Sequence, residues 1–211
     1  MRKLALHQIT IMDGGPEGLV RFAAEAGLDG VCLFTDTPRN ANGAKRLVTH
    51  IHETEILRAE DQLSSLCAMA LAHGLEVGLE FTGFSAGCNG LNAAAALHGR
   101  VDQPNLKIAI DALHLFRTGG TLEQLKASDP AIIGYAQLCD GPDFRLSDDY
   151  LDEAMNRMIP GEGVFPLKKL MTLLGPHVDI DIEVPSFAVP AGSDARTWAH
   201  RAVTASRNLF D

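Results

Sequence analysis

The strongest constraint on the fold is an alternation along the chain between short apolar runs and amphipathic helical segments. Nearly continuous apolar runs are typical of strands that are covered on both faces, and they predict a parallel sheet when helical segments separate them. The apolar runs are 3–10, 30–36, 76–81, 106–111, 131–140 and 178–184. The expected helices are 15–27, 56–74, 91–101, 121–128, 166–175 and 194–210. The sequence therefore predicts an α/β fold.

The number of strand–helix units is lower than a complete barrel requires. A (β/α)₈ barrel has eight strands and about 250 residues, whereas this chain has 211 residues and six recognisable strands. The shortfall lies between residues 36 and 76, where only RLVTHI resembles a strand. We therefore predict a TIM-barrel-like parallel β/α fold that is shortened by two βα units and forms a single domain over residues 1–211. The barrel could be open at this point or closed by a partner chain, or a segment could be absent from the sequence.

Charge and cysteine content limit the compartment and the class of partner. The formal net charge is −9, which would repel nucleic acid and anionic membrane surfaces. The four cysteines form no C-x-x-C pair, so reduced cytoplasmic thiols fit better than a disulfide framework or a thiolate zinc site. No segment approaches the roughly 20 apolar residues of a membrane span. We expect a cytoplasmic protein with a small-molecule partner, and a gap in the barrel would favour a homo-oligomer because unpaired strand edges recruit partners.

Polar residues stand at the carboxyl ends of four of the apolar runs. These residues are Glu80, Asp111, Gln137 and Glu183. Residues at this end of parallel strands converge on the ligand face, and three carboxylates with an amide oxygen suit Mn²⁺ or Mg²⁺, with Zn²⁺ as an alternative. Without a cation, the carboxylates would repel one another and raise their pKa values. A single strand-terminal acid is often a turn former or a helix N-cap, but glutamate is a poor cap. The four positions together predict a divalent metal site.

Other polar side chains could line the same cavity. His114 follows the second carboxylate by one helical turn and could bind substrate or simply pack. His7 or Gln8 could also face inward, but not both, because neighbours in a strand point to opposite sides. Arg145, in the loop after the third strand-end residue, could bind a substrate oxygen or be a solvated charge.

Two motifs are weaker signals. His50 and His52 form an H-x-H pair without a third ligand nearby in the sequence, so we assign them no chemistry. The glycine-rich turn PGEG (160–163) could approach a ligand closely, but its Glu162 argues against a bound phosphate. Neither motif changes the predicted site.

Five segments occur in a recognisable order: GLEVGLEF, NLKIAIDALHLFRTGG, IIGYAQLCDGP, PGEGVFPLKKL and VDIDIEVPS. Together they resemble the xylose-isomerase-like TIM-barrel superfamily, usually labelled sugar phosphate isomerase/epimerase, over residues 1–36 and 58–211. The resemblance implies that the four strand-end residues bind one divalent cation. It also implies substrate contacts from His114 and from Arg145 or Arg157.

The same resemblance implies an activity. It is a metal-dependent isomerase or epimerase that acts on a sugar or related polyol ketone through an enediolate, with Glu80 and Glu183 as the catalytic base and acid. A similar Glu, Asp, Gln and Glu set occurs among 3-dehydroshikimate dehydratases, so a metal-dependent lyase is an alternative. The shortened barrel leaves a third interpretation, a degenerate barrel that is non-catalytic or depends on a partner.

Overall fold

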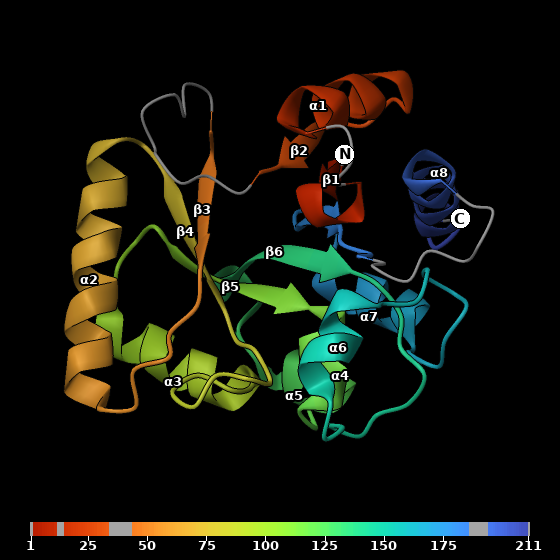
Figure 1. Cartoon of the computed structure of the whole chain (residues 1–211). Coiled ribbons are helices and arrows are strands. Elements are labelled where there is room, and N and C mark those ends of the chain that lie inside the picture. Colours follow the sequence, from red (N-terminus) through yellow and green to blue (C-terminus); the bar gives the residue numbers. More distant parts are fainter. Residues whose placement is uncertain (1, 12–14, 34–43, 186–193, 211) are drawn as a thin grey trace.

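The computed structural model describes residues 2–11, 15–33, 44–185 and 194–210, and its strands form one curled parallel sheet (Figure 1). The strand order is β2-β1-β7-β6-β5-β4-β3, and every pairing is parallel. The strands are β1 (Leu4–His7), β2 (Gly30–Cys32), β3 (Arg46–Thr49), β4 (Glu76–Glu80), β5 (Leu106–Asp111), β6 (Ile133–Leu138) and β7 (Asp179–Ile182).

Helices pack on the outer face of this sheet, except the helix over residues 150–155, which lies beside the carboxyl ends of β5 and β6 (Figure 1). They are α1 (Gly15–Glu25), α2 (Ile56–Ala72), α3 (Leu91–Val101), α4 (Ala112–Arg117), α5 (Leu122–Ala127), α6 (Tyr150–Met155), α7 (Leu167–Leu174) and α8 (Ala195–Arg207), with short 3₁₀ helices η1 (Gln8–Thr10) and η3 (Pro130–Ile132). Helix α2 contacts β4, α3 contacts β5, α1 contacts β2 and α8 contacts β7. No helix in these described ranges is long and apolar enough to cross a membrane.

The local sequence explains why the helices form where they do. In α7, Leu167, Leu170, Met171 and Leu174 are all buried, and their spacing places them on one face of the helix. Helix α5 starts with a capping box, in which Thr121 Oγ1 accepts from the Gln124 amide while the Gln124 side chain accepts from the Thr121 amide. Apolar faces and caps of this kind direct each helix onto the sheet.

The predicted shortened TIM-barrel-like fold is confirmed, but the described residues contain seven strands rather than six. The segment RLVT forms β3, and α2 follows it, so the interval 36–76 contains one complete βα unit where we expected two missing units. Every residue of β3 is half-buried, and an edge strand of this kind lacks the continuous apolar run that marks a fully covered strand. Strand β2 ends at Cys32, and residues 34–36 of the expected second strand lie outside the described residues. Within the described residues, β2 and β3 are the two edges and do not pair with each other.

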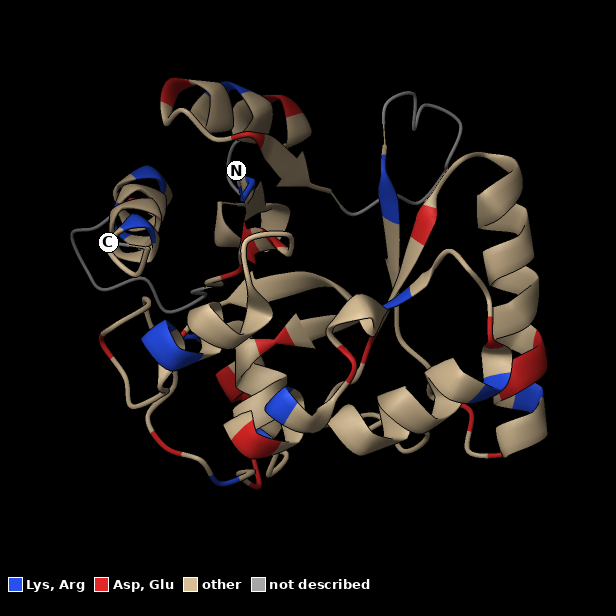
Figure 2. Cartoon of the chain, turned by 180° about the vertical axis from the view of Figure 1, so that it is seen from behind, with Lys and Arg blue, Asp and Glu red and all other residues tan. Residues whose placement is uncertain are grey.

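Arg46 ties the edge strand β3 to the centre of the sheet. Its Nε lies 2.5 Å from Glu76 Oε1, its Nη2 donates to the Gly134 carbonyl at 3.0 Å, and its guanidinium lies over the ring of Tyr135. The basic and acidic positions on the neighbouring strands β3 and β4 are visible in Figure 2. This contact lies at the amino end of β4, opposite the strand ends that carry the predicted ligands.

Candidate metal and catalytic site

The four predicted ligands lie at the carboxyl ends of four consecutive strands of the sheet. Glu80 is the last residue of β4, Asp111 the last of β5, Gln137 the last but one of β6, and Glu183 follows β7 directly. All four side chains are buried, and Asp111 and Gln137 are partners in the β5–β6 register. The fold therefore places them at one end of the sheet, as the strand-end pattern predicts.

Arg157 connects two of these carboxylates. Its Nη1 donates to Asp111 Oδ2 at 2.6 Å, and its Nη2 lies 3.3 Å from Glu183 Oε1. Its Nε donates to the Ala154 carbonyl at 2.9 Å, which fixes the guanidinium at the end of α6. Arg145 is not brought to the cluster, because its side chain is 90% exposed and pairs only loosely with Asp143, at 3.8 Å.

Gln137 and Asp111 each have a second contact. Gln137 Nε2 donates to Glu183 Oε2, whereas Gln137 Oε1 is buried without a hydrogen-bond partner. Asp111 Oδ1 accepts from the amides of Leu113 and His114 at 2.7 and 3.2 Å, so this residue is also the N-cap of α4. The two interpretations of Asp111, as a cap and as a member of the cluster, are thus compatible.

Two histidines flank Glu80. His114 Nε2 lies 3.6 Å from Glu80 Oε1, and His50 Nε2 lies 3.5 Å from Glu80 Oε2. The other ring nitrogen of His114 contacts the hydroxyl of Tyr150. Sequence reasoning missed His50 and Tyr150. His50 follows β3 directly, so the strand-end rule would have found it if RLVT had been accepted as a strand.

Glu80, Asp111 and His114 form a group that could hold a metal ion, because one ligand atom from each lies within 4.8 Å of the others. This group shares two residues with the predicted set and adds His114, which we expected to bind substrate. The coordination by Glu80, Asp111, Gln137 and Glu183 stays a prediction, and the orphaned oxygen of Gln137 fits such a role.

The charges of the cluster are unbalanced without a cation. Three buried carboxyls, Glu80, Asp111 and Glu183, surround one buried guanidinium. Burial, and then the charges of Glu183 and Asp111, raise the pKa of Glu80 well above its usual range. Burial raises the pKa of Glu183 to about 7, although Arg157 opposes this shift. If all three carboxyls ionise, two negative charges remain uncompensated, which a divalent cation would neutralise.

The pKa values of Asp111 and His114 are lowered, in contrast to those of Glu80 and Glu183. Burial raises the pKa of Asp111, but Arg157, His114 and the hydrogen bonds outweigh it, so its pKa lies below its usual value. Burial lowers the pKa of His114 to about 4. His114 is therefore a neutral imidazole at neutral pH, the form that binds metal ions.

An aromatic wall, which we define as Phe84, Tyr150 and His52, stands beside His114. The ring centroid of Phe84 lies 5.4 Å from His114, 6.0 Å from Tyr150 and 6.5 Å from His52. Phe84 is 46% exposed, whereas His114 is buried. The wall therefore extends from the buried cluster to the surface.

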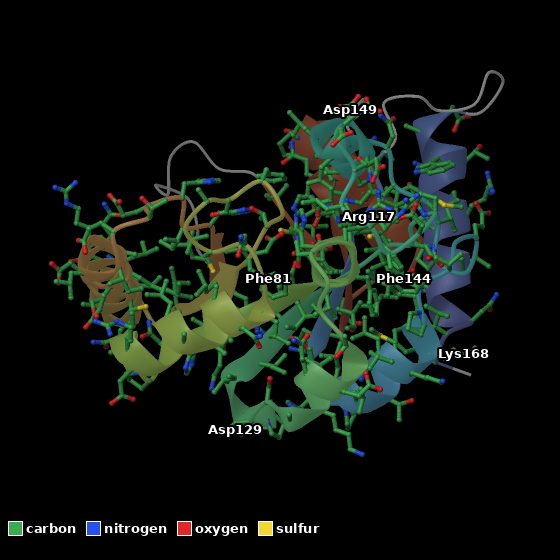
Figure 3. All side chains as sticks on the ribbon, turned by 90° about the horizontal axis from the view of Figure 1, so that it is seen from below. Phe81, Arg117, Asp129, Phe144, Asp149 and Lys168 are labelled. Carbon is green, nitrogen blue, oxygen red and sulfur yellow. The ribbon has the colours of Figure 1, made fainter. Side chains whose placement is uncertain are left out.

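Arg117 fixes the helix that carries Tyr150. This arginine is buried in α4 and forms ion pairs with Asp143 and with Glu153 of α6. Figure 3 shows Arg117 between these two helices. Helix α6 begins at Tyr150, and Arg157 follows its end by two residues. The ion pairs of Arg117 therefore restrain both of these site residues.

The glycine-rich turn PGEG packs through its glycines against Asp140. Asp140 Oδ2 accepts from the Gly161 amide at 2.9 Å, and its Oδ1 accepts from the Phe165 amide at 3.0 Å. A Cβ atom at Gly163 would lie 2.3 Å from Asp140 Oδ1, so only glycine fits this close approach. The glycine content of the turn therefore has a structural cause.

The parallel strands and the buried cluster at their carboxyl ends define the class as β/α barrels with a strand-end site. The family model described as xylose isomerase-like TIM barrel matches residues 43–200 of the chain. The chain belongs to this family.

Solved structures with low sequence identity share the fold. The IolI protein, solved with a bound zinc atom, aligns with a TM-score of 0.83 and 17% identity over 98% of this chain and 97% of that chain. L-ribulose 3-epimerase aligns with a TM-score of 0.74 and 13% identity over 99% and 94% of the two chains. D-allulose 3-epimerase from Methylomonas sp. aligns with a TM-score of 0.72 and 12% identity over 99% and 98%. No sequence among the curated proteins matches the chain.

Proposed function

We propose that the protein is a divalent-metal-dependent isomerase or epimerase of a sugar or a related polyol ketone. The observation that carries the proposal is the pair of buried glutamates, Glu80 and Glu183, in one cluster with Asp111, Gln137 and Arg157. The family and the two aligned 3-epimerases are consistent with this chemistry.

The metal would be held by Glu80, Asp111, Gln137 and Glu183, with His114 as a further donor. When bound, a divalent cation stabilises the negative charge that develops on substrate oxygens when a neighbouring C–H loses its proton. The oxygen donors favour Mn²⁺ or Mg²⁺, and participation of the His114 nitrogen would make Zn²⁺ equally suitable.

The two glutamates would move the protons. One carboxylate removes the proton from the carbon next to the carbonyl, and the other carboxyl returns a proton to the resulting enediolate. Burial raises the pKa of Glu183 to about 7 when no metal is bound. A bound cation would lower this pKa and keep the carboxylate ionised, the form that accepts a proton. Arg157 would keep Glu183 and Asp111 in position and bind a substrate oxygen.

The aromatic wall would contact the substrate on the side away from the carboxylates. A sugar presents C–H groups on one face, and these pack well on aromatic rings, whereas its hydroxyls need polar partners. Tyr150 and His114 supply such partners beside the exposed ring of Phe84. This arrangement supports a small polyol as the substrate class.

The test is deuterium exchange from solvent into candidate ketoses, followed by NMR. We expect the protein loaded with Mn²⁺, Mg²⁺ or Zn²⁺ to catalyse exchange at the carbon next to the carbonyl, and Glu80→Gln and Glu183→Gln to lower its rate by about 10²–10⁴-fold. Glu162→Gln, on an exposed glutamate paired with Arg201, is the matched control and should leave the rate unchanged. Absence of both metal binding and exchange would support the non-catalytic barrel instead.

A second candidate is a metal-dependent dehydratase. The predicted ligand set favours this activity, because its third member is the amide Gln137 and the other members are two glutamates and an aspartate. Proton removal next to a carbonyl is then followed by loss of water, which converts 3-dehydroshikimate to an aromatic product. Its ultraviolet absorbance would separate this activity from epimerisation.

A further inference from the structure

A second group of metal-binding side chains lies on β1, β2 and β7. His7 is the last residue of β1, Cys32 is the last residue of β2, and Asp181 lies within β7. Strand β1 pairs with both of the other strands, and His7 and Cys32 are partners in the β1–β2 register. One ligand atom from each of the three side chains lies within 4.8 Å of the other two.

His7 and Asp181 of this group are buried, and Cys32 is half-buried. The side chain of Asp181 is fully buried, and its Oδ2 accepts a hydrogen bond from the Tyr135 hydroxyl at 2.7 Å. Its Oδ1 is buried and accepts no hydrogen bond of normal geometry from the described residues, although the Cys32 thiol interacts with the same carboxyl group. A buried carboxylate oxygen that lacks a donor is costly, so a proton or a cation should compensate it.

The three donors have the chemistry of a zinc site. An imidazole nitrogen, a thiolate and a carboxylate are all common zinc ligands, whereas Mg²⁺ and Mn²⁺ avoid thiolates. Zinc bonds of about 2.0–2.3 Å place ligand atoms roughly 3–4 Å apart in a tetrahedron, so small side-chain rotations would suffice. Thiolate and carboxylate together balance the charge of one divalent ion.

Neighbouring groups are compatible with such an ion. The hydrogen bond from Tyr135 would orient the Asp181 carboxylate, as outer partners of metal ligands commonly do. His7 Nδ1 accepts a long hydrogen bond from the Ile9 amide at 3.3 Å, and an ion on the imidazole would replace this weak contact.

We propose that His7, Cys32 and Asp181 bind a zinc ion at a site separate from the strand-end cluster. The strand-end cluster has Glu80, Asp111 and Gln137 from β4, β5 and β6, and Glu183 just after β7. The second site has His7 and Cys32 from β1 and β2, and it takes Asp181 from β7, two residues before Glu183, so the two sites are neighbours with no ligand in common. The inference does not depend on the proposed function, because it concerns different residues and a different readout.

The test is cobalt titration of the full chain after removal of metal with a chelator. A thiolate bound to Co²⁺ gives a charge-transfer absorption in the near ultraviolet, which oxygen and nitrogen ligands do not give. We expect one thiolate-bound Co²⁺ per chain at saturation, within a total of at most two equivalents because the strand-end cluster can also bind the metal, and we expect the band to disappear when Zn²⁺ is added. Glu80→Gln should retain the band, because it alters only the strand-end cluster.

Two cysteine variants locate the sulfur. Cys32→Ser should lose the band, whereas Cys139→Ser should retain it. Cys139 is the matched control because its thiol is buried elsewhere, just after β6, where its Sγ lies 3.7 Å from Arg157 Nη1. Asp181→Asn should weaken cobalt binding at least tenfold. Retention of the band in Cys32→Ser, or its loss in Cys139→Ser, would overturn the proposal.

A further measurement guards against variants that fail to fold. X-ray absorption of the zinc-loaded Cys139→Ser chain should show one sulfur in the coordination shell, with all proposed ligands intact. A shell of nitrogen and oxygen alone would mean that Cys32 is a thiol hydrogen-bonded to Asp181, and the zinc site would be rejected.

Discussion

The central strands and the edge strands of the sheet differ sharply in burial. In β5 and β6, five of the six residues are buried, whereas no residue of β2 or β3 is fully buried. The central strands have neighbours on both sides, and, among the strands that the structure describes, β2 and β3 each have a neighbour on one side only. The predicted ligands all come from β4 to β7, so this cluster assembles where the sheet is continuous and does not require β2 and β3 to pair.

The largest expected effect would come from the central cluster. We expect Glu183→Gln to lower the rate of proton exchange by about 10²–10⁴-fold, because the amide cannot accept the proton. The melting temperature should change far less, since the amide has nearly the same shape. Exchange kinetics and thermal unfolding of the same samples check this. A loss of stability as large as the loss of activity would make Glu183 a structural residue.

Metal removal should act on the same cluster in a pH-dependent way. The pKa of Glu183 is about 7 in the folded chain, above its usual value near 4.5, so ionisation opposes folding. The metal-free protein should lose stability as the pH rises from about 4.5 through about 7. The loaded protein should show the opposite trend, because protons compete with the metal, and saturating metal should add about 2–3 kcal/mol. Thermal unfolding with chelator or metal across this range measures both trends; parallel curves would contradict a site here.

One substitution made at two places sharpens the contrast in burial. Val77→Ala on β4 removes a fully buried side chain and should cost about 2–3 kcal/mol, whereas Val48→Ala on the edge strand β3 should cost about 1 kcal/mol. Urea unfolding gives both values. Equal costs would show that β3 is packed as firmly as its neighbour.

The smallest expected effect on stability is that of a substitution outside the sheet, at the start of helix α5. Thr121→Ala should cost about 1 kcal/mol, because it removes the capping box of α5. Thr172→Ala is the matched control: this exposed hydroxyl only donates to the Lys168 carbonyl one turn earlier, and its loss should be nearly neutral. Urea unfolding measures the change in unfolding free energy for both variants. Equal changes would show that the capping box of α5 does not stabilise the protein.

The sequence predicted the central part of the fold better than its edges. LKIAID is nearly continuously apolar, with Lys107 as the exception, because β5 is covered on both faces, and Asp111 ends it as expected. RLVT was passed over because an edge strand tolerates polar residues such as Arg46. Because this strand was not predicted, His50 at its end was not recognised as a site residue.

The same physical reason explains which site residues the sequence could indicate. Strand-end residues follow a local rule, so Glu80 and Glu183 were accessible from the sequence alone. Arg145, which we expected to contact substrate, does not lie in the cluster, because its loop leaves the side chain in solvent. Arg157 does lie in the cluster, but only the family resemblance indicated it. The group of His7, Cys32 and Asp181 depends on a register between distant segments, which no local spacing encodes.

The packing of the PGEG turn on Asp140 restricts how Arg157 can move. Asp140 binds the turn through its carboxylate, its amide donates to the Met158 carbonyl at 2.9 Å, and the Arg157 amide donates to the Pro185 carbonyl at 2.9 Å. The main chain on both sides of the arginine is thus anchored. Any repositioning of the guanidinium during turnover must come from rotation of its own side-chain torsions, which takes picoseconds to nanoseconds in an open setting and longer when buried. Because Arg157 is buried, its guanidinium would reorient more slowly than an exposed side chain while its main chain stays fixed. A rate-limiting loop closure would then have to involve another segment.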